Sequence, residues 1–387
     1  MRIMKIVYIF QSLAKTAGTE RILTDKMNYF AEHTSNEITL ITCEQGDHTY
    51  PFPLSPKVKH IDLNVRFFTL SRYGRIKHRF LELIMKRNYR KRLKECLKQI
   101  QPDVICCTTY ALFEISAVIH LAKGAVSVIE AHTAKESNEK QQNFPPNSIH
   151  RFIAKLYDNH VYRTISKCQA LVTLTAGDAE NWKNVKQAVV IPNILGHYPA
   201  ELKPYPKTNR VITVGRLTKQ KGYDLLIDAW KIVHEHHPDW HLDIYGTGED
   251  KEKLTYQVSQ HNLNEVIHFH DPTPQIFDKY MMSDFYVMSS RWEGFSLVLA
   301  EAMSCGLPCV SFNCPHGPAE IIKNNEDGLI VENGNIEQFA EKINYLIEQK
   351  KVRQEMGYKA RENVKRYLPE NVMPEWLQLF ESLTHNK

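Results

Sequence analysis

The sequence predicts an α/β protein in which two doubly wound domains face a cleft. Its 387 residues are 43% hydrophobic and 24% charged, which is enough chain and enough apolar content for two cores. Short apolar runs alternate with amphipathic, helix-like stretches from end to end, a pattern typical of parallel sheets covered by helices on both faces. A stretch rich in Pro and Gly at 192–207 separates two such series, and two series indicate two domains.

The first domain is expected over residues 1–192. Short apolar runs predict its strands, which are Ile3–Ile9, Ile38–Thr42, Val104–Cys107, Val126–Ile129, Ala170–Leu174 and Val189–Ile191. Apolar residues at helical spacing predict its helices, which are Glu20–Glu32, Phe80–Ile100, Phe113–Ala122 and Ile149–Ser166. In the second of these helices, the side chains expected to face the core are Leu81, Ile84, Met85, Leu93 and Leu97.

The second domain is expected over residues 193–366. Its predicted strands are Val211–Val214, Leu242–Tyr245, Val266–Phe269, Phe285–Met288 and Pro308–Ser311. Its predicted helices are Tyr223–Glu235, Lys251–Ser259, Gln275–Met282, Leu297–Cys305 and Ile336–Gln349. Residues 352–366 also indicate a helix, and Pro369 interrupts it. The remaining segment, 367–387, is expected to form a last helix that packs back on the first domain.

Composition argues against several classes of protein. No uncharged apolar run approaches about 18 residues, so no membrane-spanning helix is expected. The first residues lack the apolar region and cleavage site of a signal peptide and fit a buried strand. Eight cysteines without a C-x-x-C pair or a secretion signal indicate a reducing, cytoplasmic compartment. A zinc site is not expected, because the closest group of ligands fits no common zinc spacing: Cys305, Cys309, Cys314 and His316.

The most informative segment begins at the end of a predicted strand. Glu293 and Gly294 are followed by a helix that contains Glu301, about 12 Å further along the helix axis and on roughly the same face. Free backbone N–H groups at the start of this helix, from Phe295 to Val298, suit a phosphate or a sugar hydroxyl. The simpler alternative is an amphipathic helix with a solvated Glu at each end. Glu301 argues against it, because a carboxylate inside an apolar helix needs a partner.

A second motif follows the first strand of the second domain. Gly215-Arg216 ends this strand, and Lys221-Gly222 precedes the next helix. Such a turn aims two cations at the mouth of the cleft, where Arg can donate two hydrogen bonds to a diphosphate and Lys adds a point charge. Two surface cations in an ordinary loop are the alternative.

In the first domain, two features lie where a ligand would bind. Gly18 precedes a helix that Thr19 can cap, and glycine lets the backbone approach a phosphate. His132 follows a predicted strand, where a functional and a structural role are about equally expected. The chain contains neither a G-x-G-x-x-G nor a G-x-x-x-x-G-K-[ST] motif, which argues against a standard NAD site and a P-loop ATPase.

Taken together, these motifs resemble those of glycosyltransferase family four. The run E-G-F-S-L-V-L-A-E-A, with Glu293 and Glu301, resembles the E-x7-E signature of retaining glycosyltransferases. Four further segments occur in the order that the family shows: the early AGTER loop, PN at 192–193, the GRL…KG segment and the G-T-G turn. The resemblance covers essentially the whole chain, and it implies the GT-B fold of two Rossmann-like domains. It also implies an acceptor-binding first domain and a second domain that binds the nucleotide sugar.

The resemblance implies a retaining hexosyltransferase of the bacterial surface-polysaccharide or lipopolysaccharide type. The enzyme would move a hexose or N-acetylhexosamine from a nucleotide-diphosphate sugar, with UDP favoured, to a glycan or lipid-linked glycan. Its implied catalytic residues are His132, Arg216, Lys221 and Glu293. Its implied donor-binding residues are Gly18, Thr273, Gly294, Phe295, Ser296, Leu297, Val298 and Glu301.

Individual roles follow from the same resemblance. Arg216 and Lys221 match the diphosphate-binding pair, while Glu293 lies near the donor sugar and Glu301 binds the ribose. One of the family's usual paired glycines before Gly18 is Ala17 here. The family is assigned a same-face displacement without a side-chain nucleophile. Because the chain has no D-x-D triplet, no metal ion or other cofactor is expected, and cations with helix N-termini would stabilise the leaving group.

Positive charge is concentrated at 72–98. This segment holds eleven Lys and Arg residues against two Glu, so it carries +9 while the rest of the chain carries −4. An ordinary solvated helix is one interpretation. Contact with an anionic membrane surface is the favoured one, since each such cation contributes about 1 kcal/mol there. It predicts a peripheral enzyme at the inner face of the plasma membrane. Nucleic acid is not expected, because no series of base-stacking aromatics accompanies the charge.

Other functions remain open. A sugar-nucleotide epimerase with the same fold would form product without an acceptor. A phosphorylase would need a pyridoxal-phosphate lysine, which the sequence does not identify. A glycan-binding module without activity would have no need for four charged residues that converge on one donor.

Overall fold

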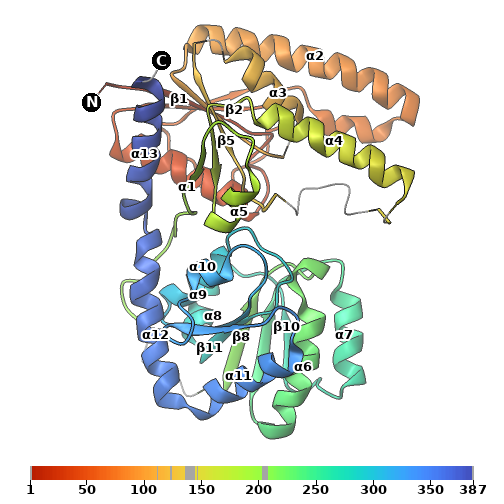
Figure 1. The fold of residues 1–387 in the computed structure, drawn as a ribbon, viewed down its shortest axis with the longest axis vertical. Coiled ribbons are helices and arrows are strands. Elements are labelled where there is room, and N and C mark those ends of the chain that lie inside the picture. The colour runs from red at the N-terminus through yellow and green to blue at the C-terminus, as the bar shows by residue number, and fades with distance from the viewer. Residues whose placement is uncertain are drawn as a thin grey trace. The chain divides into compact units, whose positions relative to one another are not determined.

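The computed structural model describes residues 2–110, 112–122, 124–135, 144–145, 147–202 and 208–385. The chain forms two units, each built on a parallel sheet with helices on its faces (Figure 1). Unit 1 comprises Met1–Ile194 and Val372–Lys387, and unit 2 comprises Leu195–Asn371. These boundaries fall within a few residues of those expected, although 203–207 of the separating stretch lie outside the described residues. The prediction of two doubly wound α/β domains is confirmed.

Unit 1 contains a seven-stranded sheet in the order β3-β2-β1-β4-β5-β6-β7, in which every neighbouring pair is parallel. Its strands are β1 (Lys5–Ile9), β2 (Glu37–Thr42), β3 (Lys59–Asp62), β4 (Val104–Thr108), β5 (Val126–Glu130), β6 (Ala170–Thr173) and β7 (Ala188–Val190). β3 was not predicted from the sequence. This edge strand has the sequence KHID and no buried residue, so it lacks the apolar run that marks the central strands.

The predicted helices of unit 1 are present, with two corrections, and α5 and the 3₁₀ helix η1 were not predicted. They are α1 (Gly18–His33), α2 (Arg75–Ile100), α3 (Leu112–Leu121), α4 (Ile149–Ile165), α5 (Ala176–Asn181) and α13 (Pro369–His385), with a short 3₁₀ helix η1 (Phe67–Arg72). First, α2 begins five residues before the expected start. Second, Ile84 was expected in the core but is 40% exposed, because only the second half of α2, with Tyr89, Leu93 and Leu97, is buried.

The last helix, α13, packs on unit 1. Its Phe380 ring lies 5.8 Å from that of Phe30 on α1, and the Trp376 ring lies 3.4 Å below Nζ of Lys26. The Thr384 side chain approaches Met4 before β1. The C-terminal segment therefore contributes to the core formed by the first residues of the chain.

Unit 2 contains a six-stranded parallel sheet in the order β10-β9-β8-β11-β12-β13. Its strands are β8 (Arg210–Val214), β9 (His241–Tyr245), β10 (Ile267–His270), β11 (Phe285–Met288), β12 (Cys309–Phe312) and β13 (Gly328–Val331). Its helices are α6 (Tyr223–His236), α7 (Lys251–Gln260), α8 (Ile276–Met281), α9 (Leu297–Ser304), α10 (Pro318–Ile321), α11 (Ile336–Glu348) and α12 (Lys350–Val364), with the 3₁₀ helices η4 (Lys219–Lys221) and η5 (Lys365–Tyr367).

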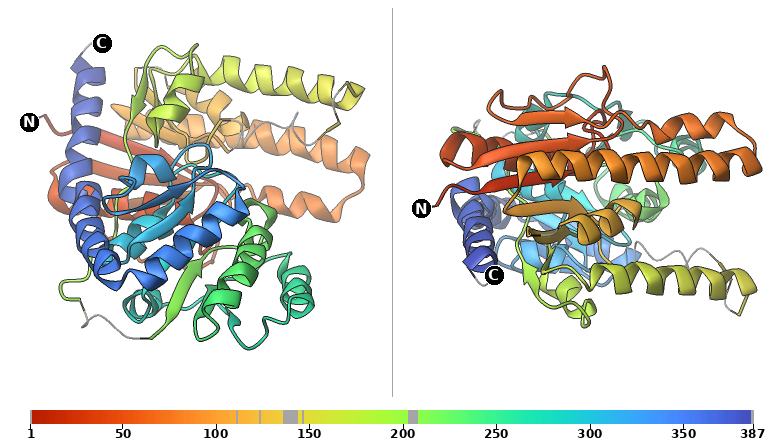
Figure 2. Two further views of the ribbon diagram at one scale, coloured as in Figure 1. Left: turned by 60° about the horizontal axis from the view of Figure 1, so that its bottom comes forward. Right: turned by 90° about the horizontal axis from the view of Figure 1, so that it is seen from above.

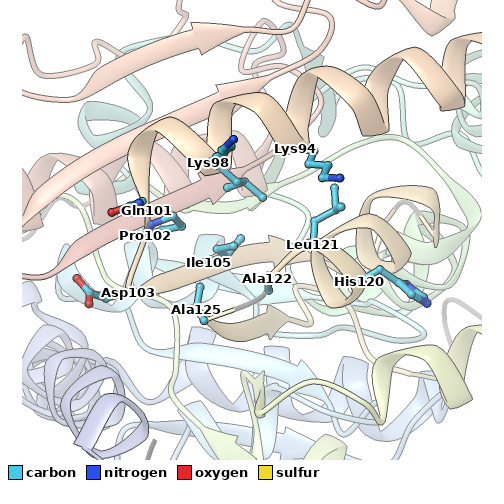
Figure 3. A pocket seen from close by; sticks show the side chains of 12 residues that line it. Lys94, Lys98, Gln101, Pro102, Asp103, Ile105, His120, Leu121, Ala122 and Ala125 are labelled. Carbon is cyan, nitrogen blue, oxygen red and sulfur yellow. The ribbon is translucent and has the colours of Figure 1, made fainter.

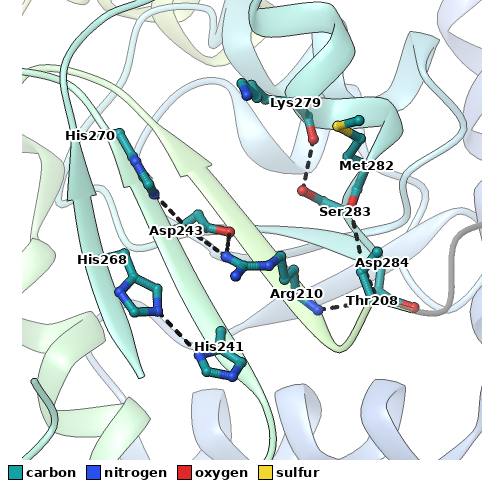
Figure 4. A network of polar contacts seen from close by, with 10 residues as sticks. All are labelled: Thr208, Arg210, His241, Asp243, His268, His270, Lys279, Met282, Ser283 and Asp284. Atoms are coloured by element: carbon teal, nitrogen blue, oxygen red, sulfur yellow. Dashed lines mark hydrogen bonds and ion pairs between the residues drawn. The ribbon is translucent and has the colours of Figure 1, made fainter. Parts of the chain in front are cut away.

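A polar network fixes the amino ends of the central strands of unit 2 (Figure 4). Arg210, the first residue of β8, donates from one guanidinium nitrogen to both carboxylate oxygens of Asp243 at 2.8 and 2.9 Å. Asp284, just before β11, accepts from the Thr208 hydroxyl at 3.0 Å and from buried Arg353 at 3.0 Å. These contacts anchor β8 and β11 at one end and leave their carboxyl ends for the loops.

None of the described helices combines the length and the apolar character that crossing a bilayer requires. All eight cysteines are free thiols, and seven of them are buried.

Unit 1 buries a carboxyl group that no cation pairs with among the described residues. Glu114 on α3 is 1% exposed, one of its oxygens lacks a hydrogen-bond partner, and the other accepts weakly from the Cys43 thiol at 4.0 Å. Burial, and secondly the charge of Glu44, raise the pKa of Glu114 from 4.5 to about 8. Glu114 is therefore protonated in the folded protein over a pH range in which the unfolded chain has released this proton.

We predict that Glu114→Gln stabilises the protein increasingly as pH rises. Between the unfolded pKa of 4.5 and the folded pKa of about 8, the folded state of the wild type binds more protons, so its stability falls with rising pH. Glutamine carries no such proton. Urea unfolding of both proteins across this range measures the difference, and Glu95→Gln on the exposed face of α2 is the control. A difference that stays constant with pH would contradict the prediction.

Candidate active site

The candidate active site forms at the carboxyl ends of two neighbouring strands in unit 2. β8 ends at Val214 and β11 ends at Met288, and the two strands pair in parallel. The chain runs outward from β8 through β9 in one direction and from β11 through β12 in the other. Ligands of open parallel sheets bind at such a switch point. The loops 215–222 and 289–296 are therefore placed for binding.

Hydrogen bonds hold these two loops together. The Ser289 hydroxyl donates to the Lys221 carbonyl at 2.9 Å, and the Arg291 backbone N–H donates to the Gln220 carbonyl at 2.8 Å. Gly222 makes this approach possible. Its φ of +64° is left-handed, and a Cβ there would lie 2.1 Å from the Ser289 carbonyl oxygen. The glycine of the Lys221-Gly222 pair is therefore required by its left-handed backbone conformation and by the close approach of the two loops.

The loops place Lys221 and Glu293 side by side. Nζ of Lys221 lies 2.7 Å from Oε1 of Glu293, and the two side chains are 16% and 7% exposed. The Glu293 backbone N–H donates to the Pro315 carbonyl at 3.4 Å, so a third segment also supports this residue. Burial, and secondly the charge of Glu293, raise the pKa of the neighbouring Cys314 thiol to about 12. A carboxylate and an ammonium are thus held in fixed positions at the switch point.

The start of α9 offers backbone donors beside this pair. The N–H groups of residues 294–298 donate to no acceptor within the described part of the chain. The Ser296 side chain does not cap the helix, and its hydroxyl lies 3.1 Å from the Met288 sulfur. Phe295 is buried against Tyr367, with the ring centroids 5.0 Å apart. Free amides at a helix N-terminus attract anions.

Glu301 lies on the same helix and is buried, at 6% exposed. Burial, and secondly the charge of Glu301, raise the pKa of Tyr280 well above its usual value. The alternative of a helix with a solvated Glu at each end is therefore wrong, because Glu293 is also buried, at 5% exposed.

Two further predicted residues lie on loops at the same edge of the sheet. Arg216 follows β8, is exposed, and pairs with no carboxylate among the described residues. Thr273 follows β10 and is half-buried; its hydroxyl donates to the Gln275 side chain at 2.9 Å and accepts from the Gln275 N–H at 3.2 Å. The structure thus brings Lys221, Glu293 and the α9 amides together and places Arg216 in the loop that carries Lys221.

In unit 1, His132 belongs to a buried cluster. Its Nε2 lies 3.1 Å from Oε2 of Glu130, and the same oxygen lies 2.6 Å from Nζ of Lys26. Burial alone would raise the pKa of Glu130, but Lys26 and His132 outweigh it and lower this pKa to about 2. Glu130 therefore orients the His132 ring, and Lys26 ties both to α1.

The loop before α1 differs in one detail from the expectation. Gly18 is exposed and is itself the first residue of the helix, with Ala17 as an extended N-cap whose side chain makes no cap bond. Thr19 therefore lies inside the helix and is not its cap, and its hydroxyl pairs with that of Tyr110 at 2.8 Å.

An ion pair that was not predicted from the sequence braces this site. Arg291 donates from both terminal guanidinium nitrogens to the two carboxylate oxygens of Asp224 on α6, at 2.8 and 2.7 Å. Burial raises the pKa of Asp224, but Arg291 outweighs this effect and lowers it. Arg291 belongs to the SSRWEGF segment, but its partner Asp224 is 67 positions away in the sequence. The pair became visible only once the structure showed that β8 and β11 are neighbours.

A cavity of about 620 Å³ lies elsewhere, between the ends of α2 and α3 (Figure 3). Lys98, Asp103 and His120 are among its lining residues, and Asp103 directly precedes β4. The cavity is therefore at the amino ends of the strands, the edge opposite to the one where ligands of this fold class bind.

The chain is similar to known glycosyltransferases. Residues 197–363 match the family model described as glycosyl transferases group 1. An uncharacterized glycosyltransferase of Haemophilus influenzae is 26% identical over 380 residues, covering 96% of this chain and 98% of its own. The amylovoran biosynthesis glycosyltransferase AmsD of Erwinia amylovora is 27% identical over 383 residues, with the same coverage.

A solved structure shows the same fold over the whole chain. A TarM variant from S. aureus, in complex with fondaparinux, α-GlcNAc-glycerol and UDP, gives a TM-score of 0.76. It covers 98% of this chain and 100% of its own at 16% identity. Residues 197–363 thus match the group 1 glycosyl transferase model, within a chain that has the GT-B fold of glycosyltransferases.

Proposed function

We propose that the protein is a retaining glycosyltransferase that uses a nucleotide-diphosphate sugar, most favourably a UDP-sugar. It would move a hexose or N-acetylhexosamine to a glycan or lipid-linked glycan acceptor in bacterial surface polysaccharide synthesis. The observation that carries this proposal is the Lys221–Glu293 pair at 2.7 Å beside the free amides of residues 294–298. Positive charge and N–H donors suit a diphosphate, and a fixed carboxylate suits sugar hydroxyls.

Each residue then has a defined task. Lys221 and the exposed Arg216 would neutralise the diphosphate as it leaves, which is the largest charge change in the reaction. Glu293 holds the Lys221 ammonium in place and leaves its second oxygen for the donor sugar. The amides of 294–298 would donate to the distal phosphate and sugar, and Glu301 would accept from the ribose hydroxyls.

We propose more limited roles for three predicted residues that lie outside this group, which are Thr273, His132 and Gly18. Thr273 would border the base, at the end of β10. In unit 1, His132 would contact the donor sugar, and Gly18 would let the start of α1 approach the diphosphate. The Glu130–His132 bond at 3.1 Å supports a role for the other ring nitrogen, Nδ1, because the carboxylate occupies Nε2 and fixes the orientation of the ring.

The proposed reaction is a same-face displacement. The leaving diphosphate oxygen would help to remove the acceptor proton, and the protein would contribute positioning and charge stabilisation. Since Arg216 and Lys221 supply the positive charge, we propose that no metal ion or other cofactor takes part.

The relatives support the choice of substrates. UDP is bound in the TarM complex, which supports a UDP-sugar donor. The relative named for amylovoran biosynthesis supports a glycan product. We place the enzyme in the cytoplasm, at the inner face of the plasma membrane, with the basic segment 72–98 on the anionic surface.

We predict that the protein consumes one UDP-sugar in the presence of EDTA and first releases or transfers the sugar as its α-anomer. Retention keeps the α-linkage of the donor, and the charge balance above needs no metal. Proton NMR of the reaction measures the first anomer formed. A β-anomer would show inversion, and an epimerised donor would show an epimerase. No turnover of any UDP-sugar would contradict the proposed donor.

A further inference from the structure

Two helices of unit 1 expose an unusual amount of apolar surface. Residues 75–88, the first half of α2, include no buried side chain, and α4 is exposed over most of its first three turns. Figure 2 shows both helices, orange and yellow-green, running outward from the sheet in the same direction. These segments therefore project beyond the core that holds the rest of unit 1.

Large apolar side chains cover the projecting parts. Of the twenty such side chains that are exposed among the described residues, nine belong to α2 and α4. On α2 they are Ile76, Phe80, Leu83 and Ile84, and on α4 they are Ile149, Phe152, Ile153, Leu156 and Tyr157. Ile76 is 89% exposed and Ile149 is 71% exposed, so the neighbouring helices do not cover them. A cluster of this kind indicates an interaction surface.

The same surface is strongly cationic. The +9 charge of 72–98 lies on α2 and the residues just before it, and α4 adds Arg151, Lys155 and Arg163. The acidic residue of α4, Asp158, is buried at 3% exposed and does not offset these charges at the surface. Cations interleaved with aromatic and aliphatic side chains are typical of surfaces that bind at the interface of an anionic bilayer.

A groove joins the two helices. It has a volume of about 650 Å³, and both α2 and α4 line it. The lining includes Lys86 and Arg90 from α2, and Tyr157 and His160 from α4. Both helices therefore border the same groove, and Leu112, Phe113 and Ser116 of α3 line it between them.

We propose that α2 and α4 form a single membrane-docking surface, in which the nine exposed apolar side chains enter the interface of an anionic bilayer. The surrounding Lys and Arg side chains bind its phosphate groups. The inference extends the membrane contact proposed above, since it assigns α4 and the apolar side chains a role that the charge of 72–98 does not provide. It rests on the proposed function only for the lipid-linked acceptor.

Charge complementarity favours a bilayer over a second copy of this chain. If two copies met through this surface, the cations of one would face the cations of the other, which is unfavourable. Nucleic acid would neutralise the cations but would leave the apolar side chains in water. An anionic bilayer satisfies both parts of the surface.

The test is sedimentation of the full-length protein with vesicles. Vesicles of phosphatidylcholine and phosphatidylglycerol are compared with vesicles of phosphatidylcholine alone, without nucleotide. We expect at least tenfold stronger binding to the anionic vesicles, since several cations each favour such a surface. Equal binding to both vesicles, or binding to neither, would overturn the proposal.

The variant Phe152→Ser with Ile153→Ser separates α4 from the basic segment. Both side chains are more than half exposed, so the folded core does not depend on them. Losing their insertion should weaken binding at least tenfold, and raising the salt concentration should not abolish this difference. The matched control is Tyr256→Ser with Tyr358→Ser, at 66% and 69% exposed on α7 and α12, and it should bind as the wild type does.

The variant with Arg75, Arg79 and Arg87 changed to Gln tests the charges. Its binding should fall about 100-fold at low salt. If the Phe152 and Ile153 variant sedimented with anionic vesicles as the wild type does, a role of α4 in membrane binding would be refuted. It would also be refuted if these side chains instead held a dimer, which size-exclusion chromatography of the variant and wild type detects. A UDP-induced rise in melting temperature that all variants retain would show that they still bind nucleotide. A loss of vesicle binding would then not be caused by a damaged donor site.

Discussion

Replacing Lys221 with Met is expected to weaken UDP binding about 10- to 100-fold, the loss that follows from removing one charge-assisted hydrogen bond. The side chain lies at the switch point of unit 2, and its ammonium is fixed 2.7 Å from Glu293. Calorimetric titration of UDP into both proteins measures the change. Lys219→Met is the matched control, because Lys219 is exposed in the same loop and its side chain makes no contact with Glu293.

Lys221→Met is also expected to lower the stability of the protein, so its effect on folding is measured separately from its effect on UDP binding. Removing one partner of a buried ion pair costs about 3–5 kcal/mol, and Glu293 would be left buried without its partner. A double-mutant cycle with Glu293→Gln isolates the interaction between the two residues. Unchanged UDP affinity in a folded Lys221→Met protein would show that this lysine serves structure alone.

The second large effect is expected in unit 1. Glu130→Gln should lower the free energy of unfolding by about 3–5 kcal/mol, because it leaves the Lys26 ammonium buried without a counter-charge. The Lys26 and Glu130 side chains are 2% and 3% exposed. For a unit of this size the change corresponds to a fall in Tm of about 6–20 °C. Thermal unfolding of the wild type and variant measures it.

The size of this effect should depend on pH. Burial lowers the pKa of Lys26 even beside Glu130, so without Glu130 the amine can release its proton in alkaline solution. The destabilisation is therefore expected to be larger near neutral pH than at high pH. Glu37→Gln is the control, because its partner Lys59 is 70% exposed and the pair is expected to contribute less than about 1 kcal/mol. Equal effects of the two substitutions would contradict the prediction.

The two sheets were predictable because their central strands are buried on both faces. Such strands appear as continuous apolar runs, for example Val104–Cys107, whereas the edge strand β3, with the sequence KHID, carries no such signal. The boundaries of α2 were harder to predict. Its first half has apolar residues at helical spacing, which normally face a core, but none of its side chains is fully buried.

Parts of the candidate site were predictable from local sequence. Glu293, Gly294 and Glu301 share one segment, and a strand followed by a helix start is a local pattern. The pairing of Lys221 with Glu293 was not predictable, because it depends on β8 lying next to β11 and on residues 72 positions apart. For the same reason the structure was needed to show that Arg291 braces Asp224 and that His132 belongs to a buried cluster.

The most direct test of the central claim is a calorimetric titration of UDP into the wild-type protein and into Glu301→Ala, both in EDTA. The claim is that unit 2 binds a nucleotide diphosphate through its own side chains and amides. It predicts saturable, one-to-one binding to the wild type that EDTA does not weaken, and a loss of at least about tenfold in Glu301→Ala. Absence of UDP binding to the folded wild type, or equal binding to both proteins, would contradict it.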